Sequence, residues 1–594
     1  MWEVLTLQDV VPYLCNVCQH FCQLLREVYI EHGADWHIIL YCDGVTPGAV
    51  LAPDNKRKSI LWYSTILEFG SKLCHQELWF CLASIQASVS KLVPARLAGL
   101  TRHVVRDMVC GDRAIDTAGI MLPVGREGRL ELVRFHYHAT LADEEALSAM
   151  LGIKGSAGLS PCALRCWCVN KEKSCDTKRG VLPVTARGAN IVDITCVNKA
   201  DIDCKTDADV WADCDHLVRN VGHPDFKEIE SCSGITYHPE GILFDLELRK
   251  SFKPSSSHRY DALHVLFSNG LLAAELMLFM KLAKQHTGKY FASFREYCER
   301  AEWHSPGTVK PQGVFSAARE KSSDTSLKAG ASEQLVVYPV LRQWALQECI
   351  GIPAMRASLR SLLLLLDVAD LVLEAATQRL RDQDVENIAS RLDTAAFAYL
   401  EAFVNAHGRE EMRHKHHELG HLADQLRADK RLLWCFTAER KHITAKAVME
   451  HSKGMRAFAF GAVARMLTAQ ISRLEDDIPA WLSTLRTPVI EIPELGSDCR
   501  MSRSMVWIGC AVRHGNPLFV GHGRAVLILV VACVAGGGRF GVLGHACLRV
   551  RGDAFSSEWT AQPAIVQHWL VPTDAIQVAR HWRFIDADRL SVLS

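Results

Sequence analysis

The sequence has no excess of charge of either sign and no apolar run long enough to span a membrane. Lys plus Arg and Asp plus Glu each number 67 among 594 residues, so the overall charge does not favour nucleic acid as a partner. A DNA-binding role would therefore require a local basic surface. The two most apolar windows, residues 361–373 and 525–538, are too short or too interrupted by aspartates to cross a bilayer.

The N-terminus also lacks a basic flank leading into an apolar stretch, which is the pattern of a secretory signal. We therefore expect a soluble intracellular protein with no membrane partner. The 22 cysteines would then be buried thiols or metal ligands, because an intracellular compartment is reducing. No internal repeat is visible, and a hydrophobic content of 49% is typical of folded globular domains.

Short buried strands and one helix alternate in the first 150 residues. The expected elements are, in order, strands at 36–44, 57–69 and 77–89, a helix at 94–110, and a hairpin around 125–128. The first strand ends in Asp43, and the second arm of the hairpin ends at Asp143. This order predicts the opening of an RNase H-like α/β core, with both carboxylates at the carboxyl ends of strands.

The rest of the chain predicts two insertions and a separate β domain. We expect an α/β core with a Cys-rich insertion, a large all-α insertion and a small C-terminal all-β domain. The expected parts are an N-terminal helix (1–35), the first part of the core (36–154), a Cys/Asp-rich insertion (155–257), a helical element of the core (258–305), a linker (306–336), a helical region (337–490) and the β domain (498–594).

Five motifs follow one another along the chain: YCDGVTPG at residues 41–48, DNKRK at 54–58, ADEEALSAMLGIKGSAGLSPC at 142–162, YDALH at 260–264 and CFTAERKH at 435–442. In this order they resemble eukaryotic cut-and-paste DDE transposases of the CACTA and Plavaka-like kind. The resemblance spans roughly residues 36–450. Each motif is short, and their order and spacing carry the specificity.

The resemblance implies a DNA enzyme with a two-metal site. Asp43, Asp143 and Glu439 would hold two Mg²⁺ ions, with Asp261 and His264 in support. Such a site hydrolyses phosphodiester bonds at transposon ends and joins the 3′-OH to target DNA. The implied partners are DNA and a second copy of the chain, and the implied location is the nucleus.

The Cys-rich insertion departs from the family's usual Pro-Cys-x-x-Cys spacing, because this chain has PCALRCWC at residues 161–168. A structural zinc ion held by Cys162, Cys166, Cys168 and Cys196 is expected, with Cys175 as an alternative ligand.

HELGH, at residues 417–421, reads as the zinc helix of a metallopeptidase. His417 and His421 would be the ligands on one helical face, and Glu418 the general base. The chain has 26 histidines, several of them crowded here, so a chance match is the competing interpretation. The related family also tends to carry histidines in this helix, before its last acid.

Each proposed catalytic residue also has a purely structural interpretation. Asp43 would then form a turn with Gly44, Asp143 would cap a helix, and Glu439 would lie on a solvated helix face. Asp261 and His264 would form a structural pair. Three functions thus remain open from the sequence: an active transposase, a catalytically dead transposon-derived DNA-binding or interaction protein, and a zinc metallopeptidase.

Overall fold

The computed structural model describes residues 2, 4–49, 52–170, 188–288, 290–301, 309–377, 380, 382–452 and 458–476, and strand segments between residues 484 and 593. The chain forms two compact units. The first comprises residues 1–264, 385–393 and 411–477, and the second comprises residues 265–384, 394–410 and 478–594. Every predicted site residue that the structure describes belongs to the first unit.

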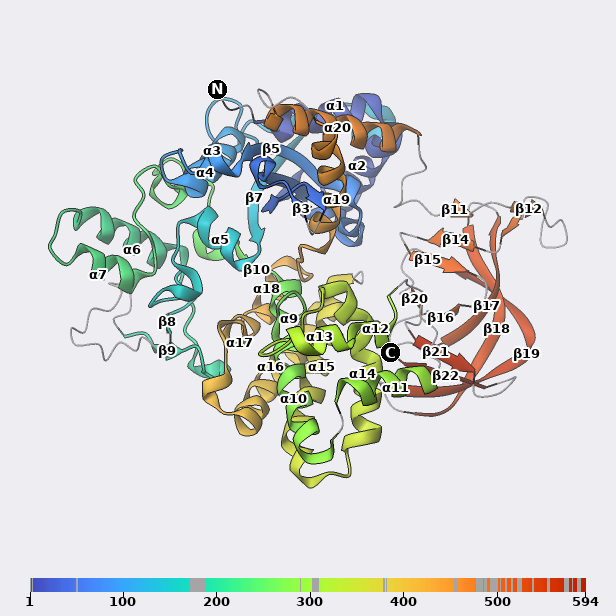
Figure 1. Ribbon diagram of the computed structural model, residues 1–594. Helices are drawn as coiled ribbons and strands as arrows, with labels where there is room; N and C mark the ends of the chain where they lie inside the picture. Colours follow the sequence, from blue (N-terminus) through green and yellow to red (C-terminus); the bar gives the residue numbers. More distant parts are fainter. Residues whose placement is uncertain are drawn as a thin grey trace. The chain divides into compact units, whose positions relative to one another are not determined.

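The first unit is built on a mixed sheet with the strand order β10-β7-β1-β4-β5 (Figure 1). Its strands are β1 (Asp35–Val45), β4 (Ser59–Ile66), β5 (Phe80–Gln86), β7 (Glu131–Ala142) and β10 (His258–Tyr260). β4 is antiparallel to both β1 and β5, whereas β7 is parallel to both β1 and β10. The short strand β6 (Ile120–Leu122) pairs with β7 as the expected hairpin. The mixed α/β architecture predicted for this part is confirmed.

A bulge in β7 sets the register of the two long parallel strands. The pairs on either side of it are Ile38–Tyr137, Ile39–Ala139 and Tyr41–Leu141. His138 is therefore the extra residue on β7, opposed by no residue of its own on β1. Beyond the bulge the pairing runs evenly, and it brings Asp43 level with Asp143.

The N-terminal residues form two helices rather than the single helix expected over 1–35. α1 (Leu7–Val17) ends at Cys18, which has an extended backbone and caps α2 (Gln19–His32). The Cys18 sulfur accepts a hydrogen bond from the backbone N–H of Phe21 at 3.4 Å. Gly33, with φ of 78°, ends α2 where the sequence predicts a stop, because this backbone conformation favours glycine.

Two helices from far along the chain pack on this N-terminal sheet (Figure 1). α20 (Phe458–Asp476) contacts β5, and α19 (Phe436–Glu450) contacts β1. α19 is anchored by Lys441, whose Nζ is buried and donates to Gln76 O at 3.0 Å and to Gln470 Oε1 of α20 at 2.8 Å. A helix more than 390 residues after β1 is thereby held against that strand.

The expected helix at 94–110 is α4 (Arg96–Val109), and it packs against α5 (Glu144–Leu151). The region 155–257 is more regular than expected. It contains α6 (Asp207–Arg219), α7 (Phe226–Ser233) and the paired strands β8 (Cys168–Val169) and β9 (Val192–Asp193). Residues 171–187, which include Cys175, lie outside the described residues.

The second unit contains the helical region and the C-terminal strands. Its helices of at least eleven residues are α10 (Leu271–Thr287), α11 (Phe291–Ala301), α14 (Ala331–Cys349), α15 (Arg356–Thr377) and α16 (Asp382–His407), the last shared with the first unit. Two short helices, α12 (Pro311–Val314) and α13 (Ala317–Ser322), lie in the segment expected to be a linker. Among the described residues, the stretch 262–287 is helical and apolar enough to cross a membrane, and 78% of its apolar window is buried inside the protein.

The C-terminal strands are longer than the sequence suggested. β17 (Val526–Gly536), β18 (Arg539–Gly552) and β19 (Ser556–Leu570) form consecutive antiparallel pairs at the centre of a larger sheet. Their lengths of 11, 14 and 15 residues exceed those of a typical strand.

Candidate metal centre and acidic sheet edge

Three adjacent parallel strands each end in an aspartate. Asp43 lies near the end of β1, Asp143 directly follows β7, and Asp261 directly follows β10. The register makes them neighbours, because Tyr260 pairs with Ala142 and parallel strands carry their carboxyl ends at one edge of the sheet. Adjacent strands are about 4.8 Å apart, so successive strand ends bring the side chains within reach of one another.

Glu439 joins these aspartates from α19. Its Oε1 lies 3.4 Å from Nε2 of His264, and Asp43 Oδ2 lies 3.5 Å from Nδ1 of His442, one turn further along α19. Asp43, Asp143, Asp261 and Glu439 are hereafter the acidic edge. The structure thus brings together the three acids expected to be catalytic with the supporting Asp261 and His264.

The electrostatics of the acidic edge are those of crowded carboxylates. Burial and the negative charge of Asp143 raise the pKa of Asp43 to about 6. Burial raises the pKa of Glu439 to about 7, although the neighbouring His264 acts in the opposite direction. The carboxylates of Asp261, Asp43 and Asp143 add to that increase. A divalent cation would remove this mutual repulsion, so the cluster has the charge and the oxygen ligands that hard cations prefer.

Asp261 is more deeply enclosed than the other acids. Its side chain is 1% exposed, and Oδ1 accepts a hydrogen bond from Cys435 N at 2.9 Å. Oδ2 bonds to Nδ1 of His264, which leaves Nε2 of that ring facing Glu439. Burial alone would lower the pKa of His264, but the Asp261 hydrogen bond and the Glu439 charge raise it to about 9. Asp261 therefore orients a charged histidine toward the acidic edge and ties the start of α19 to β10.

Asp143 combines the structural role considered in the sequence with its place at the edge. Its Oδ1 accepts a hydrogen bond from Ala146 N at 2.7 Å and caps α5. This bond fixes the carboxylate against the end of β7. One oxygen is engaged by the cap, and the other forms no hydrogen bond with a described residue and could act as a ligand.

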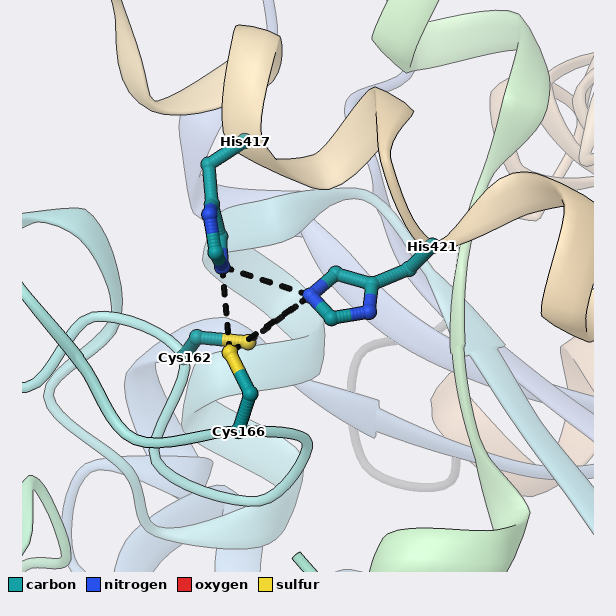
Figure 2. Close-up of side chains that lie close together, drawn as sticks. All are labelled: Cys162, Cys166, His417 and His421. Atoms are coloured by element: carbon teal, nitrogen blue, oxygen red, sulfur yellow. Dashed lines mark hydrogen bonds between the residues drawn. The ribbon is translucent and has the colours of Figure 1, made fainter. Parts of the chain in front are cut away.

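A second cluster joins the Cys-rich insertion to the histidine helix. Cys162 and Cys166 lie beside His417 and His421, and their ligand atoms are all within 4.8 Å of one another (Figure 2). These four residues are hereafter the Cys/His centre. His417 belongs to α17 (His414–Leu419), and His421 caps the start of α18 (Leu422–Asp429).

The spacing within the Cys/His centre fits a tetrahedral zinc ion. His417 Nε2 lies 3.2 Å from His421 Nε2 and 3.2 Å from Cys166 Sγ. His421 Nε2 lies 3.5 Å from Cys162 Sγ and 3.6 Å from Cys166 Sγ. Zinc–nitrogen and zinc–sulfur bonds at tetrahedral angles would separate two nitrogens by roughly 3.3 Å and a nitrogen from a sulfur by roughly 3.6 Å.

The chemistry of these side chains supports the same conclusion. All four are buried, and the Nδ1 atoms of both histidines are buried without a hydrogen bond to any described residue. Burial raises the pKa of the Cys162 and Cys166 thiols and lowers the pKa of His421 well below its usual range. A neutral imidazole is already the ligand form, and a bound cation would supply the charge that two thiolates need. The cluster can therefore bind a metal such as zinc.

The structure divides the predicted four-cysteine set. Cys162 and Cys166 belong to the Cys/His centre, whereas Cys168 and Cys196 do not, among the residues described. The two histidines that replace them are those of HELGH. The sequence contained this signal, because two histidines four residues apart on a helix are a common ligand pair. Their pairing with cysteines 251 residues earlier could not be seen from spacing alone.

The glutamate of HELGH has a different partner. Glu418 Oε1 lies 3.2 Å from His414 Nδ1, which is also 3.3 Å from Glu144 Oε1. The two carboxylates raise the pKa of His414 to about 10, although burial opposes this. A metallopeptidase zinc has three protein ligands and an open position for water. Here four protein side chains surround a buried point, which is the arrangement of a structural site.

The Cys/His centre touches the strand that carries Asp261. The Cys162 sulfur lies 2.9 Å from the hydroxyl of Tyr260, the last residue of β10. Gln425 of α18 holds the same residue with two bonds, accepting from Tyr260 N at 2.8 Å and donating to Tyr260 O at 3.0 Å. Because Asp261 follows directly, Tyr260 connects the Cys/His centre with the acidic edge.

No protein-family model matches this chain, and no curated protein matches it.

Proposed function

We propose that this chain is a two-metal phosphodiester-transfer enzyme of the DDE transposase kind. One observation carries the proposal: Asp43, Asp143 and Asp261 lie at the carboxyl ends of three parallel strands in register, and α19 adds Glu439 to the same edge. Two Mg²⁺ ions, when bound, would activate the attacking oxygen and stabilise the leaving one. Asp43, Asp143 and Glu439 would hold them, while Asp261 and His264 orient the surrounding side chains.

The sheet supports an RNase H-like core. Numbered along the chain, its main strands have the spatial order 3-2-1-4-5, and only the second runs against its neighbours. In that fold the first strand, the fourth strand and a later helix carry the acidic ligands. β1, β7 and α19 carry them here. Strand order and acid placement are independent features of the molecule, and both favour the same fold.

Zinc is the ion proposed for the Cys/His centre, where it would be structural. It would fasten the Cys-rich insertion to α17 and α18, the helices that lead to α19 and Glu439. This role explains why two HELGH histidines lie in a nuclease-like unit, and it replaces the peptidase interpretation. Nuclear location, DNA as a partner and a homo-oligomeric state belong to this proposal as well.

Cleavage and strand transfer by the purified full-length chain test the proposal. A supercoiled plasmid and a labelled duplex would be incubated with Mg²⁺ or Mn²⁺, and nicked and joined products would be separated on gels. Asp43→Asn and Asp143→Asn should each reduce product formation about a thousandfold, because each removes a ligand worth several kcal/mol of transition-state stabilisation. Glu439→Gln should have a comparable effect.

Glu145→Gln is the matched control. Glu145 is exposed in the first turn of α5, two residues after Asp143, and should be dispensable. Full activity in the Asp43 and Asp143 variants would refute the catalytic assignment. Metal-independent DNA binding, with no cleavage by the unaltered chain under either ion, would instead identify a catalytically dead DNA-binding protein.

A further inference from the structure

A cavity of about 590 Å³ lies over the earlier parts of β1 and β7. Its lining includes His37 of β1 and His136 and His138 of β7. His37 and His138 precede Asp43 and Asp143 by six and five residues, respectively. At about 3.3 Å per residue, the cavity is some 16–20 Å from the acidic edge along the strands. It is therefore separate from the acidic edge.

Positively charged side chains dominate the cavity walls. The cationic lining residues are Arg165, Lys250, Lys253 and Arg259. Asp116 is the one carboxylate in the lining formed by described residues, and its Oδ2 accepts a hydrogen bond from the Ser251 hydroxyl at 2.5 Å. The cavity and its four cations are hereafter the cationic pocket.

Three of these cations have donors to spare. Lys250 and Lys253 are exposed and form no ion pair with any described residue. Arg165 donates from one terminal nitrogen to Ser255 O at 3.0 Å, but its Nε is buried and bonds to no described residue. Arg259 is different, because its Nε and one terminal nitrogen both donate to Asp429 at 2.7 Å, and its charge is balanced.

The histidines add further donors. Each uses one ring nitrogen on a carboxylate outside the lining: His37 on Glu68 at 2.7 Å, His136 on Asp35 at 3.0 Å and His138 on Asp429 at 2.7 Å. The second ring nitrogen of each forms no hydrogen bond with the described residues. The hydrogen bond that His37 donates to Glu68 raises the pKa of His37. The second N–H of the protonated His37 ring can then donate to a ligand, and His136 and His138 line the same cavity.

We propose that the cationic pocket binds phosphate groups. Phosphate oxygens accept hydrogen bonds from lysine ammonium groups, from an arginine with an unused N–H and from imidazole N–H groups. The phosphate could belong to a polynucleotide backbone or to a small phosphate compound, since the recognised chemistry is the same. This proposal goes beyond the metal-dependent reaction and does not depend on it. A protein with no net charge needs a local basic surface to bind nucleic acid. If the ligand is a polynucleotide backbone, the cationic pocket is that surface.

Binding measurements without added divalent cation test this inference separately from cleavage. The full-length chain would be titrated with a labelled 20-base-pair duplex over a salt series, and separately with pyrophosphate by calorimetry. The variant Lys250→Ala/Lys253→Ala removes the two exposed cations. The control Lys91→Ala/Lys227→Ala makes the same charge change at two exposed lysines outside the pocket. Arg165→Gln removes the orphaned donor.

If the ligand is a polynucleotide backbone, the plot of log K against log salt has a negative slope. The pocket variant should reduce the magnitude of that slope by about 1.8 relative to the control, at about 0.9 per phosphate contact. Arg165→Gln should weaken duplex binding about tenfold. Loss of pyrophosphate binding with unchanged duplex binding would identify a small phosphate compound as the ligand. If both double variants lose duplex affinity equally and neither changes pyrophosphate binding, the proposal is overturned.

Discussion

The acidic edge takes three of its four carboxylates from adjacent strand ends of one sheet, whereas the Cys/His centre joins two segments that are 251 residues apart. In the first cluster, backbone register does the positioning, and each side chain needs only to follow its strand. In the second, side chains reach across an insertion boundary, and a bound ion would hold the segments together. The contrast predicts that the Cys/His centre matters mainly for stability and the acidic edge mainly for chemistry.

Removing a ligand of the Cys/His centre should have the largest effect on stability. Cys166→Ser should lower the free energy of unfolding by about 3–5 kcal/mol, because zinc binding contributes directly to folding. Zinc content by elemental analysis and thermal unfolding would measure this. Cys168→Ser is the matched control, since Cys168 is equally buried two residues away and should keep the zinc. Equal zinc loss in both variants would contradict the assigned ligand set.

A change at Asp261 should affect the acidic edge while leaving the Cys/His centre loaded. Asp261→Asn removes the charge that orients His264 and weakens the tie to Cys435. Mn²⁺ affinity should fall roughly 10–100-fold, the usual effect of losing a partner that positions a metal site. Mn²⁺ binding by calorimetry or electron paramagnetic resonance would show it. Simultaneous loss of zinc would mean that the two clusters depend on each other, which would contradict separate roles in stability and in chemistry.

The metal-free acidic edge should destabilise the protein as the pH rises. The pKa of Asp43 is raised by folding to about 6, so the folded state binds more protons than the unfolded state above pH 4. Stability should therefore fall by on the order of 1–2 kcal/mol between pH 4 and pH 7, allowing for solvent screening. Thermal unfolding in zinc-loaded protein would measure this, and millimolar Mg²⁺ should reverse it. Asp43→Asn should remove only part of the pH dependence, because burial also raises the pKa of Glu439 to about 7, and it should weaken the response to Mg²⁺.

The smallest effect is expected at the connection between the clusters. Tyr260→Phe deletes the hydroxyl that contacts the Cys162 sulfur and leaves both hydrogen bonds between Gln425 and the Tyr260 backbone. The loss should be about 1 kcal/mol, with zinc released a few times faster to a competing chelator. Unchanged release would show that the backbone bonds alone carry the connection.

The contrast between the acidic edge and the Cys/His centre also explains which parts of the fold and of the site could be predicted from the sequence. Strand patterns and terminal acids are local, so β1, β4, β5, β7 and the pair Asp43 and Asp143 could be predicted from the sequence. Glu439 was expected only through the resemblance, because nothing local distinguishes it from a solvated glutamate. The ligand partners of Cys162 and Cys166 depend on how distant segments pack. Spacing therefore pointed to the nearer Cys168 and Cys196. The cationic pocket was not predicted, since its lining comes from six separate stretches of chain.

His138, the extra residue in β7, has a consequence for how this protein can change. A shift of one residue in register moves every later side chain of a strand to the other face of the sheet. The bulge absorbs such a shift, because the pairs on either side of it, Ile38–Tyr137 and Ile39–Ala139, are consecutive on β1. Deletion of His138 would therefore take a histidine from the cationic pocket but leave Asp143 level with Asp43. A residue inserted or deleted between Ala139 and Ala142 would instead put the two aspartates out of register, so length variation that spares the acidic edge should fall outside that stretch.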